Sequence, residues 1–516
     1  MVRCSEPADV NTLIATLGLS DTSASNVARA VQDLSEGTTD VRRAAAACAI
    51  SRTVFGNRTG SMVDTYIDST ATNYFNRIDV NWSDSCWLNA SCIISPSTVD
   101  DVASALRIIN STGSKFATRS GGHNPNPGFG STDSSGVLID MVNINTLQIS
   151  PDRRTISIGP GNRWENVYHG LNGSGVFATG GRVPPVGVGG LMLGGGMPFF
   201  SSLYGLASDA VQDYEIILAN SSLVHANAQE NSELWWALKG GGPNFGIVTK
   251  YTVDAIPSGN VWFEQRLYNS SQTPELLPAV VGYQAAAEND PNSNLVFTAT
   301  SAGTVVGFIY AQPIVRPPVF SMFYDIPFES TTSNSTIGTP AELADSYANV
   351  IPIESTRFVT CSTVLEPDLK TYQQSYSQYV DIAAQVAASF NGAMTWVIQP
   401  LQSRAAEIGY QRGGNALGLS NVSQSWFTAS VQWKSDSNTQ AAFAAVQATC
   451  GAVKKASVTN GVSLPNLFQN DANYAQNVLA SYGPANLARL KATSLKYDPQ
   501  RVFQKLQNSG FLVSRA

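Results

Sequence analysis

The sequence predicts an α+β fold with at least two domains, and three observations carry this prediction. The chain has 516 residues, more than one hydrophobic core usually organises. Residues 92–120 read as a strand, an amphipathic helix and a second strand, which is the pattern of a βαβ unit. Residues 257–459 alternate β-branched runs with amphipathic helices, which is typical of an antiparallel sheet covered by helices.

The composition excludes several classes of partner. The chain has 31 Lys and Arg against 38 Asp and Glu, for a formal net charge of -7, and no basic run could follow a phosphate backbone. No stretch reaches the roughly 18–20 consecutive apolar residues that span a bilayer. We therefore expect no nucleic acid and no membrane as partner. We also expect a monomer.

The glycosylation acceptors favour the secretory pathway. The first residues lack the apolar segment of a signal peptide, so the compartment has to be inferred indirectly. Asn-x-Ser/Thr acceptors suit a glycosylated surface, although a chain rich in Ser, Thr and Asn contains several by chance. The acceptors are Asn57, Asn81, Asn89, Asn110, Asn172, Asn220, Asn269, Asn334 and Asn421.

The cysteines indicate disulfides and no metal site. The chain contains six cysteines, and none has the spacing of a metal site or of a redox pair. A bridge between Cys48 and Cys92 would tie the N-terminal segment to the first strand, and we expect it. The alternative is six unpaired thiols.

The first half of the chain reads as a helical extension followed by short strands. Apolar residues recur at helical spacing over residues 9–50, with Thr39 or Asp40 as a helix N-cap. A glycine and sequon cluster near residue 60 ends this extension. The helix of the βαβ unit then places Val99, Val102, Ala103, Leu106 and Ile109 on one face.

The second half reads as a separate domain and a return segment. Residues 372–390 and 438–450 have the pattern of amphipathic helices, and a C-terminal helix over 484–496 is expected to return to the first domain. The predicted segments are 1–78 as the helical extension, 79–256 as the first domain, 257–459 as the second domain and 460–516 as the return.

Three glycine-rich strings are the strongest indication of a ligand-binding site. FATRSGGHNPNPGFG, residues 116–130, has paired glycines after a strand, where backbone N–H groups can converge on a diphosphate. FATGGRVPPVGVGGLMLGGGM, residues 177–197, indicates close approach to a flat or extended ligand, or very tight packing. It is no Rossmann fingerprint, because two prolines interrupt it and no ordinary βαβ surrounds it. The third string is LWWALKGGGPNFGIVTKY, residues 234–251, which again has closely spaced glycines before a strand.

The three histidines differ in their sequence context. His123 closes the first glycine turn, where a lone histidine is more often a hydrogen-bonded turn residue than a ligand. His169 lies on a predicted helix and His225 at a strand end, and both are expected to be structural. The succession of the three glycine strings is what favours a functional role for His123.

Taken in order, the strings and the tail RLKATSLKYDPQRVFQ resemble the vanillyl-alcohol-oxidase superfamily, and within it the fungal branch of the berberine-bridge-enzyme-like FAD-linked oxidases. The resemblance covers residues 85–256 and 460–516. It implies a PCMH-type FAD-binding domain of two α/β subdomains, a separate substrate domain, and FAD bonded covalently through its 8α carbon to His123. The other cofactor-binding residues that it implies are Arg119, Ser120, Gly121, Gly122, Asn124, Val183, Val186, Gly187, Gly189, Gly190, Gly194, Gly195, Gly246 and Val248.

One departure from the family pattern concerns the flavin. Many relatives bind it a second time through a cysteine, and the matching position here is Val183, whose alkyl side chain cannot form a thioether. We therefore expect a single covalent link and a lower flavin potential than in doubly linked relatives. The family's small oxygen-access position falls on Val186, whose modest size resembles the oxidases.

The other departure concerns the catalytic base. Relatives often use a Tyr or Glu of the substrate-domain sheet, or the Tyr of a C-terminal Tyr-x-Asn stretch. Here that stretch reads FQND, with Phe468 in place of Tyr and Asn470 retained, and the strand over 425–433 has no ionisable side chain. A base must come within about 3 Å of its proton, and the sequence leaves its identity open. Candidates for the pocket are Phe468, Asn470, Tyr310, Trp396, Gln399 and Asn415, each as compatible with a structural role.

The resemblance predicts a secreted oxidase that removes a hydride from an alcohol, phenol or amine carbon of a small secondary metabolite and passes the electrons to O2, giving H2O2. An oxidative cyclase or pericyclase is the first alternative, because ring closure can depend more on substrate shape than on a base. A carbohydrate oxidase is the second. A non-catalytic flavin-fold binding protein is the third, and the retained His123 and glycine strings argue against it. The fold alone does not identify the substrate.

Overall fold

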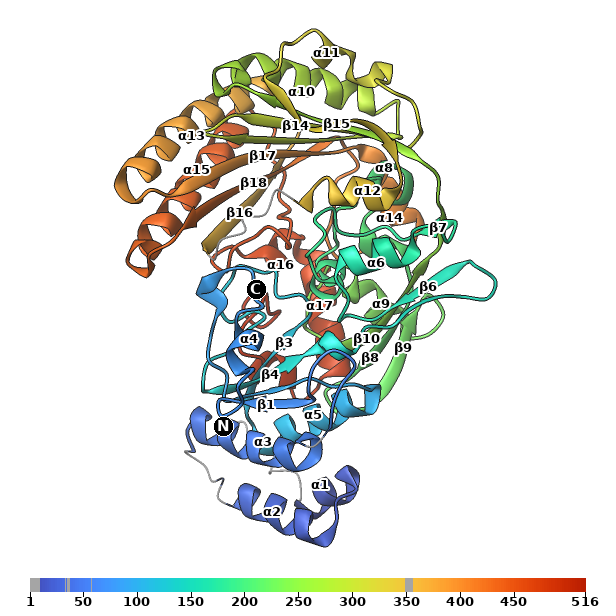
Figure 1. Cartoon of the computed structure of the whole chain (residues 1–516), viewed down its shortest axis with the longest axis vertical. Helices are drawn as coiled ribbons and strands as arrows, with labels where there is room; N and C mark the ends of the chain where they lie inside the picture. Colours follow the sequence, from blue (N-terminus) through green and yellow to red (C-terminus); the bar gives the residue numbers. More distant parts are fainter. Residues whose placement is uncertain (1–9, 33, 35–37, 57, 349–355) are drawn as a thin grey trace.

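The computed structural model describes residues 10–32, 34, 38–56, 58–348 and 356–516. Three sheets and their helices stack along the long axis of the molecule, with the N-terminal helices at one end and the largest sheet at the other (Figure 1). This arrangement confirms the α+β prediction. Among the described residues, no helix is long and apolar enough to cross a bilayer.

The N-terminal extension forms three helices, as predicted: α1 (Val10–Leu17), α2 (Asp21–Gln32) and α3 (Asp40–Phe55). Thr39 caps α3 by accepting a hydrogen bond from the backbone N–H of Arg42. A disulfide between Cys48 and Cys92 joins α3 to strand β2 (Cys92–Ile94), which confirms the predicted pairing.

The sequence did not indicate the second disulfide, between Cys361 and Cys450. Cys86 is a buried free thiol, whereas Cys4 and the acceptor Asn57 lie outside the described residues.

The first small sheet has the strand order β1-β2-β4-β3. It contains β1 (Tyr66–Asp68), β2, β3 (Lys115–Arg119) and β4 (Gly136–Asp140). Helix α5 (Val99–Thr112) crosses from β2 to β3, and β4 lies between these two strands and parallel to both. The predicted βαβ unit is therefore present, with one strand inserted. Because β1 pairs with β2, the sheet begins before residue 79.

The second small sheet is antiparallel, in the order β5-β6-β10-β8-β9. Its strands are β5 (Leu147–Ile149), β6 (Thr155–Ile158), β8 (Val211–Ile217), β9 (Leu223–Asn227) and β10 (Ile247–Asp254). The connections include α6 (Trp164–Leu171), α7 (Val188–Leu193), α8 (Ser201–Tyr204), α9 (Ser232–Leu238) and the two-stranded pair β7 (Val176–Phe177) with β11 (Ile256–Pro257). The second and third glycine strings lie in these connections.

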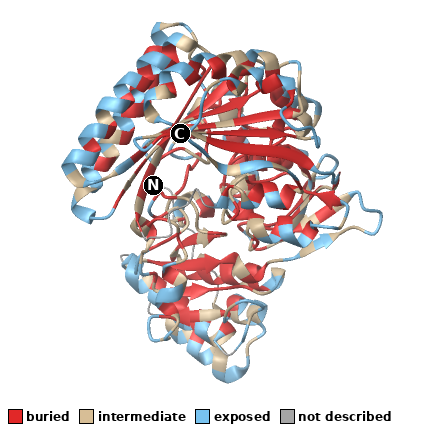
Figure 2. Cartoon of the chain, turned by 45° about the horizontal axis from the view of Figure 1, so that its top comes forward, coloured by how far each residue is buried: buried red, intermediate tan, exposed pale blue. Residues whose placement is uncertain are grey.

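The large sheet has seven antiparallel strands in the order β15-β12-β14-β13-β17-β18-β16. They are β12 (Val261–Tyr268), β13 (Ser293–Thr300), β14 (Thr304–Tyr310), β15 (Ser330–Gly338), β16 (Arg357–Leu365), β17 (Ala393–Leu401) and β18 (Gln424–Trp433). One face is covered by α10 (Thr273–Ala287), α13 (Leu369–Phe390) and α15 (Thr439–Thr459), and the strands between these layers are mostly buried (Figure 2). The other face packs toward the small sheets.

The C-terminal segment returns to the small sheets. Its helices are α16 (Val478–Ser481), α17 (Pro484–Tyr497) and α18 (Val502–Lys505). α17 packs on α9, and Gln507 forms a parallel bridge with Phe116 at β3. The shorter helices elsewhere are α4 (Tyr74–Ile78), α11 (Ser321–Tyr324), α12 (Pro340–Asp345) and α14 (Ser403–Gln411). The domain boundaries at 78, 256 and 459 stay predictions.

Candidate functional site

The three glycine strings, far apart in sequence, meet in the structure. The backbone N–H of Gly189 donates to Ser120 Oγ at 3.0 Å, which joins the second string to the first. A Cβ on Gly121 would lie only 2.5 Å from the backbone nitrogen of Gly187, so these two backbones are in direct contact. The backbone N–H of Gly242 in the third string donates to the carbonyl of Leu193 at 3.0 Å. Together the strings form one cradle of backbone.

Two positions show why this cradle needs glycine. Gly122 has φ +70°, and a Cβ there would lie 2.8 Å from Asn81 Oδ1. Gly195 has φ +101°. Backbone in this region is strained for any residue with a side chain. The loop before His123 therefore presents bare backbone, which is how a chain can bind a diphosphate without a cationic side chain.

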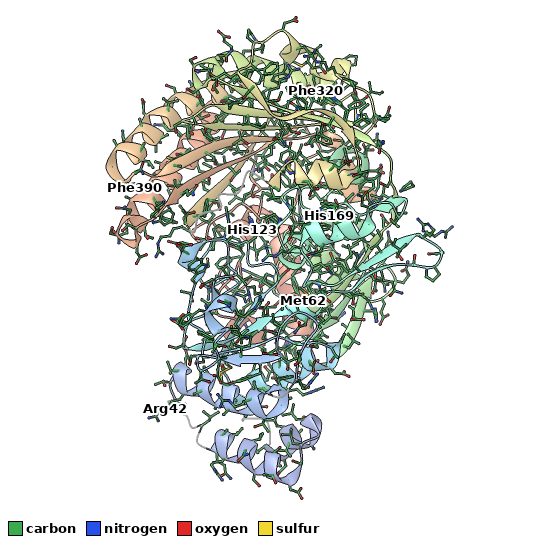
Figure 3. All side chains as sticks on the ribbon, viewed as in Figure 1. Arg42, Met62, His123, His169, Phe320 and Phe390 are labelled. Carbon is green, nitrogen blue, oxygen red and sulfur yellow. A yellow bond between two sulfur atoms is a disulfide. The ribbon has the colours of Figure 1, made fainter. Side chains whose placement is uncertain are left out.

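His123 lies where the small sheets face the large one (Figure 3). Its ring stacks on Trp82 with 4.4 Å between centroids, and Trp82 stacks on Phe358 of β16 at 4.0 Å. Nε2 is buried and has no hydrogen-bond partner within the described chain. Burial, and secondarily the nearby charge of Arg163, lowers the pKa of His123 to about 3. The imidazole is therefore neutral, with one nitrogen uncommitted.

The other residues implied for the cofactor surround this cradle in different ways. Arg119 is buried, with its Nη2 2.7 Å from Asp140 Oδ2, so its guanidinium supports the loop from beneath. Val183 and Val186 belong to one turn, closed by a 3.1 Å bond from the N–H of Val186 to the carbonyl of Val183. Gly187, Gly189, Gly190 and Gly194 lie in or beside α7, Val248 is buried in β10, Gly246 precedes β10, and Asn124 follows His123.

These residues fit a dinucleotide flavin on two observations of this structure. The cradle consists of backbone in which Cβ atoms would clash, and His123 offers a neutral, buried ring nitrogen without a partner. The first suits a pyrophosphate, and the second suits the covalent attachment that the sequence predicts.

A polar cluster links the glycine cradle to the large sheet. Arg182, in the second string, donates through Nη2 to Gln399 Oε1 on β17. Gln399 Nε2 in turn donates to Asp471 Oδ2 at 2.8 Å. The three side chains thus come from the cradle, the large sheet and the C-terminal segment, and we call them the Arg182–Gln399–Asp471 cluster.

The carboxyl of Asp471 is electrostatically unusual. Burial raises its pKa above the ordinary range, while the hydrogen bond from Gln399 and the charge of Arg182 oppose part of this rise. Burial lowers the pKa of Arg182, and the nearby Tyr347, Asp471 and Tyr168 offset part of that effect. A carboxylate with a raised pKa can accept a proton under mild conditions, which is what a general base requires.

The sequence had drawn attention to Asn470 and Gln399 but missed Arg182 and Asp471. Asp471 directly follows the retained Asn470, and Arg182 directly precedes Val183. Their positions beside recognised motif residues are the only local signal, and that signal does not distinguish them from solvated charged side chains. Whether the side chains meet across the domains depends on tertiary contacts.

Asn470 and Phe468 both lie on the same side of the large sheet as the cluster. Asn470 Oδ1 accepts from the N–H of Gly196 at 3.1 Å, and its Nδ2 donates to the carbonyl of Gly190 at 3.3 Å. Phe468 packs on Trp426 of β18 with 4.3 Å between ring centroids. Asn470 therefore fixes the glycine string, and Phe468 contributes an apolar wall.

The structure does not bring Tyr310 or Trp396 into this region. Trp396 packs between the sheet and its helices, against Tyr376 and Phe427. Tyr310 belongs to the same helix-side core and donates to Asp290 at 3.2 Å. Their side chains point to the face opposite Gln399, because successive residues of a strand alternate between faces.

The remaining candidates have local partners. Asn415 Nδ2 donates to Asp209 Oδ1 at 3.0 Å. His169 and His225 are exposed and pair with Asp345 and Asp213, at 3.0 and 2.8 Å. Within the described residues, no group of His, Cys, Asp and Glu could hold a metal ion.

Comparisons with known proteins agree with this geometry. Residues 90–227 match a family model described as an FAD binding domain. The chain is 35% identical to an FAD-dependent monooxygenase of Arthrobotrys oligospora, over 91% of this chain and 89% of that protein. It is 33% identical to the bifunctional solanapyrone synthase of Alternaria solani, over 82% and 81% of the two chains.

Solved structures share the fold. 6-Hydroxy-D-nicotine oxidase from Arthrobacter nicotinovorans superposes with a TM-score of 0.72 at 21% identity, over 86% of this chain and 97% of that one. Xylooligosaccharide oxidase from Myceliophthora thermophila gives a TM-score of 0.70 at 20% identity, with the same coverage.

The fold, the glycine cradle and these relatives define an FAD-linked oxidoreductase. More narrowly, the chain belongs to the family of its fungal relatives that are named FAD-dependent monooxygenases, and it shares the fold of a berberine-bridge-enzyme-like protein from Physcomitrella patens.

Proposed function

We propose that the protein is an FAD-dependent oxidase that removes a hydride from a carbon of a small alcohol, phenol or amine and uses O2 as electron acceptor. The observation that carries the proposal is the Arg182–Gln399–Asp471 cluster, because it sets a carboxylate with a raised pKa between the flavin cradle and the substrate-domain sheet. Fungal relatives of secondary metabolism support a small metabolite as substrate.

FAD would be held by one covalent bond, from His123, whose buried Nε2 has no partner within the described chain. Val183 cannot form a second bond. A structural neighbour, glucooligosaccharide oxidase, is named for its 6-S-cysteinyl, 8α-N1-histidyl FAD. A histidine is present here at His123, and the cysteine of that pattern is absent.

Asp471 is the general base. The bound flavin supplies the acceptor for the hydride that leaves the substrate carbon. Asp471 takes the proton from the substrate hydroxyl or amine, so that the carbon and its heteroatom gain a double bond as hydride departs. Gln399 fixes the carboxylate orientation through its 2.8 Å bond to Oδ2, and Arg182 favours the charged, proton-accepting form.

Val186 would border the approach of oxygen to the cofactor. This half-buried side chain lies in the turn that follows Val183, and the turn's backbone bonds fix its direction. A valine leaves more room than a leucine would. The protein is secreted and monomeric in this proposal, and the two disulfides among the described residues support an oxidising compartment.

An oxidative cyclase is the second candidate. One relative is named as a bifunctional solanapyrone synthase, and the stacked Phe468 and Trp426 supply an apolar wall that could hold a folded substrate. A carbohydrate oxidase has weaker support, because the oligosaccharide oxidases resemble this chain in fold at about 20% identity or less.

Peroxide release and isotope incorporation test the proposal together. The holoenzyme is screened with aromatic, polyketide-like and sugar alcohols for H2O2 release and for anaerobic flavin bleaching. An oxidase bleaches without oxygen, releases about one H2O2 per product, and incorporates no 18O from 18O2. Incorporation of 18O would instead identify a monooxygenase, as several relatives are named.

A cyclised product separates the second candidate from the first. Mass-neutral ring closure without bleaching would contradict the oxidase reading, whereas bleaching followed by ring closure would extend it.

A further inference from the structure

Arg182 holds hydrogen-bond donors for which the protein supplies no acceptor. Its Nη2 donates to Gln399, whereas its Nη1 is buried without a partner among the residues that the structure describes. A guanidinium has five N–H donors and cannot accept a hydrogen bond. Leaving a charged donor buried and unmatched is costly, so a ligand oxygen at this point would stabilise the site.

Two fully buried arginines differ from Arg182 in their ion pairs, although one nitrogen of each also lacks a partner among the described residues. Arg119 lies 2.7 Å from Asp140, and Arg266 lies 2.7 Å from Glu264. Each therefore has a carboxylate in direct contact. Within the described chain Arg182 forms no such ion pair, and it reaches Asp471 only through the neutral amide of Gln399. Its charge is thus left for a partner that the described residues do not provide.

Tyr347 adds a second unmatched donor near this charge. The residue is 7% exposed, and its hydroxyl has no partner among the described residues. The hydroxyl lies against β14, where a Cβ on Gly307 would come within 2.3 Å of it. The glycine therefore makes room for the phenol. Burial raises the pKa of Tyr347, and the charge of Arg182 opposes part of this rise.

We propose that Arg182, assisted by Tyr347, binds an oxyanion of the substrate, a carboxylate or an ionised enol or phenol, beside the carbon that is oxidised. The inference rests on the proposed function, because it assigns a substrate class to the same site. It makes the substrate a small acidic metabolite. The oxyanion would pair with Arg182 while the reacting hydroxyl faces Asp471.

Ligand binding tests this assignment without turnover. The holoenzyme is titrated with benzoate and with its neutral analogue benzamide, followed by the change in visible flavin absorption and by equilibrium dialysis. Benzoate is expected to bind more tightly than benzamide, and Arg182→Met to weaken benzoate by about tenfold or more without weakening benzamide. Arg182→Lys should recover part of the loss, and Arg154→Met, at an exposed arginine, serves as the matched control.

A second comparison measures the binding of 4-nitrophenolate and of its neutral analogue nitrobenzene. A preference for benzoate assigns a carboxylate, and a preference for 4-nitrophenolate assigns an ionised phenol or enol. Equal binding of anion and neutral analogue by the wild type would overturn the proposal, as would undiminished anion binding in Arg182→Met. If Arg182→Met fails to fold, the anion preference of the wild type and its retention in Arg182→Lys still decide the question. A failed oxidase proposal would show differently, as absent flavin bleaching with every alcohol while anion binding persists.

Discussion

The two halves of the proposed site differ in what would recognise a ligand. In the flavin half it would be backbone, because Gly121 and Gly187 are in contact and Gly122 adopts φ +70°. In the large sheet it would be side chains, and only those on one face. Gln399 of β17 points toward Arg182, whereas Trp396 of the same strand is fully buried under the helices. Glycine patterns can be recognised along a sequence, whereas the orientation of a sheet face cannot.

The largest effect should come from filling the cradle. Gly122→Val places a β-branched side chain at φ +70°, 2.8 Å from Asn81 Oδ1, at a cost of roughly 1–3 kcal/mol in backbone strain alone. We expect nearly normal circular dichroism with most of the flavin lost, measured as the ratio of visible to ultraviolet absorption. Gly130→Val is the matched control, because its Cβ would meet no atom within 4 Å. Full, acid-stable flavin in Gly122→Val would contradict the cradle.

Removing the His123 side chain should reduce flavin content less than filling the glycine cradle does. His123→Ala keeps the backbone, so FAD should still bind but become extractable by acid precipitation. His169→Ala, at an exposed histidine paired with Asp345, should keep its flavin bound. A tryptic digest of the wild type should give one flavinylated peptide, containing His123. Flavin that stays attached in denatured His123→Ala would exclude His123 as the anchor.

The low pKa of His123 predicts how covalent attachment of the flavin depends on pH. The neutral imidazole is the form that can bond to carbon, and a pKa of about 3 keeps the ring neutral above that pH. Covalent loading of apoprotein with FAD should therefore not slow between pH 8 and pH 5 on account of His123, followed by acid-stable absorbance. If His123 had the usual pKa of about 6.5, it would become protonated over this range and the rate of covalent loading would fall markedly.

The two faces of the large sheet should respond differently to truncation. Trp396→Ala removes a fully buried ring from the helix-side core and should lower the free energy of unfolding by about 3–5 kcal/mol. Flavin reduction by substrate in the folded fraction should stay unchanged. Gln399→Leu should have the opposite profile, with a modest change in melting temperature and slower reduction. Slower reduction in Trp396→Ala would place that face in the site after all.

The smallest expected effect concerns oxygen. Val186→Leu should slow reoxidation of reduced flavin several-fold and leave anaerobic reduction unchanged, since the added methylene narrows the approach without touching the Arg182–Gln399–Asp471 cluster. Stopped-flow mixing of reduced enzyme with air-saturated buffer measures it, with Val224→Leu of β9 as a distant control. Unchanged reoxidation would remove Val186 from this role.

Much of the flavin half could be predicted because its signals are local. The three glycine strings and a helix cap at Thr39 or Asp40 follow from residue type and spacing. The structure confirms the cap at Thr39 and the expected Cys48–Cys92 bridge. Trp396 and Gln399 are three positions apart, so on one strand they face opposite sides. That spacing alone excludes a shared pocket, but which face meets the flavin depends on how α13 and α15 cover the sheet.

Arg182 and Asp471 could not be recognised for a related reason. Each is a single charged residue beside a recognised motif position, and nothing local distinguishes it from a solvated side chain. They gain their role from Gln399, which lies 217 residues from Arg182 and 72 from Asp471. Such a meeting depends on the docking of two domains, which no short pattern encodes.

The most direct test of the account is the anaerobic rate of flavin reduction in Asp471→Asn, with a substrate found by peroxide release. We predict a fall of about 10²–10⁴-fold with flavin content unchanged, the usual loss on removing a general base. The wild-type rate should rise with pH through a carboxyl pKa above the ordinary range, because the base acts when deprotonated. Asp290→Asn, whose carboxylate bonds Tyr310 on the other face, should reduce like the wild type. Reduction in Asp471→Asn at the wild-type rate would contradict the account.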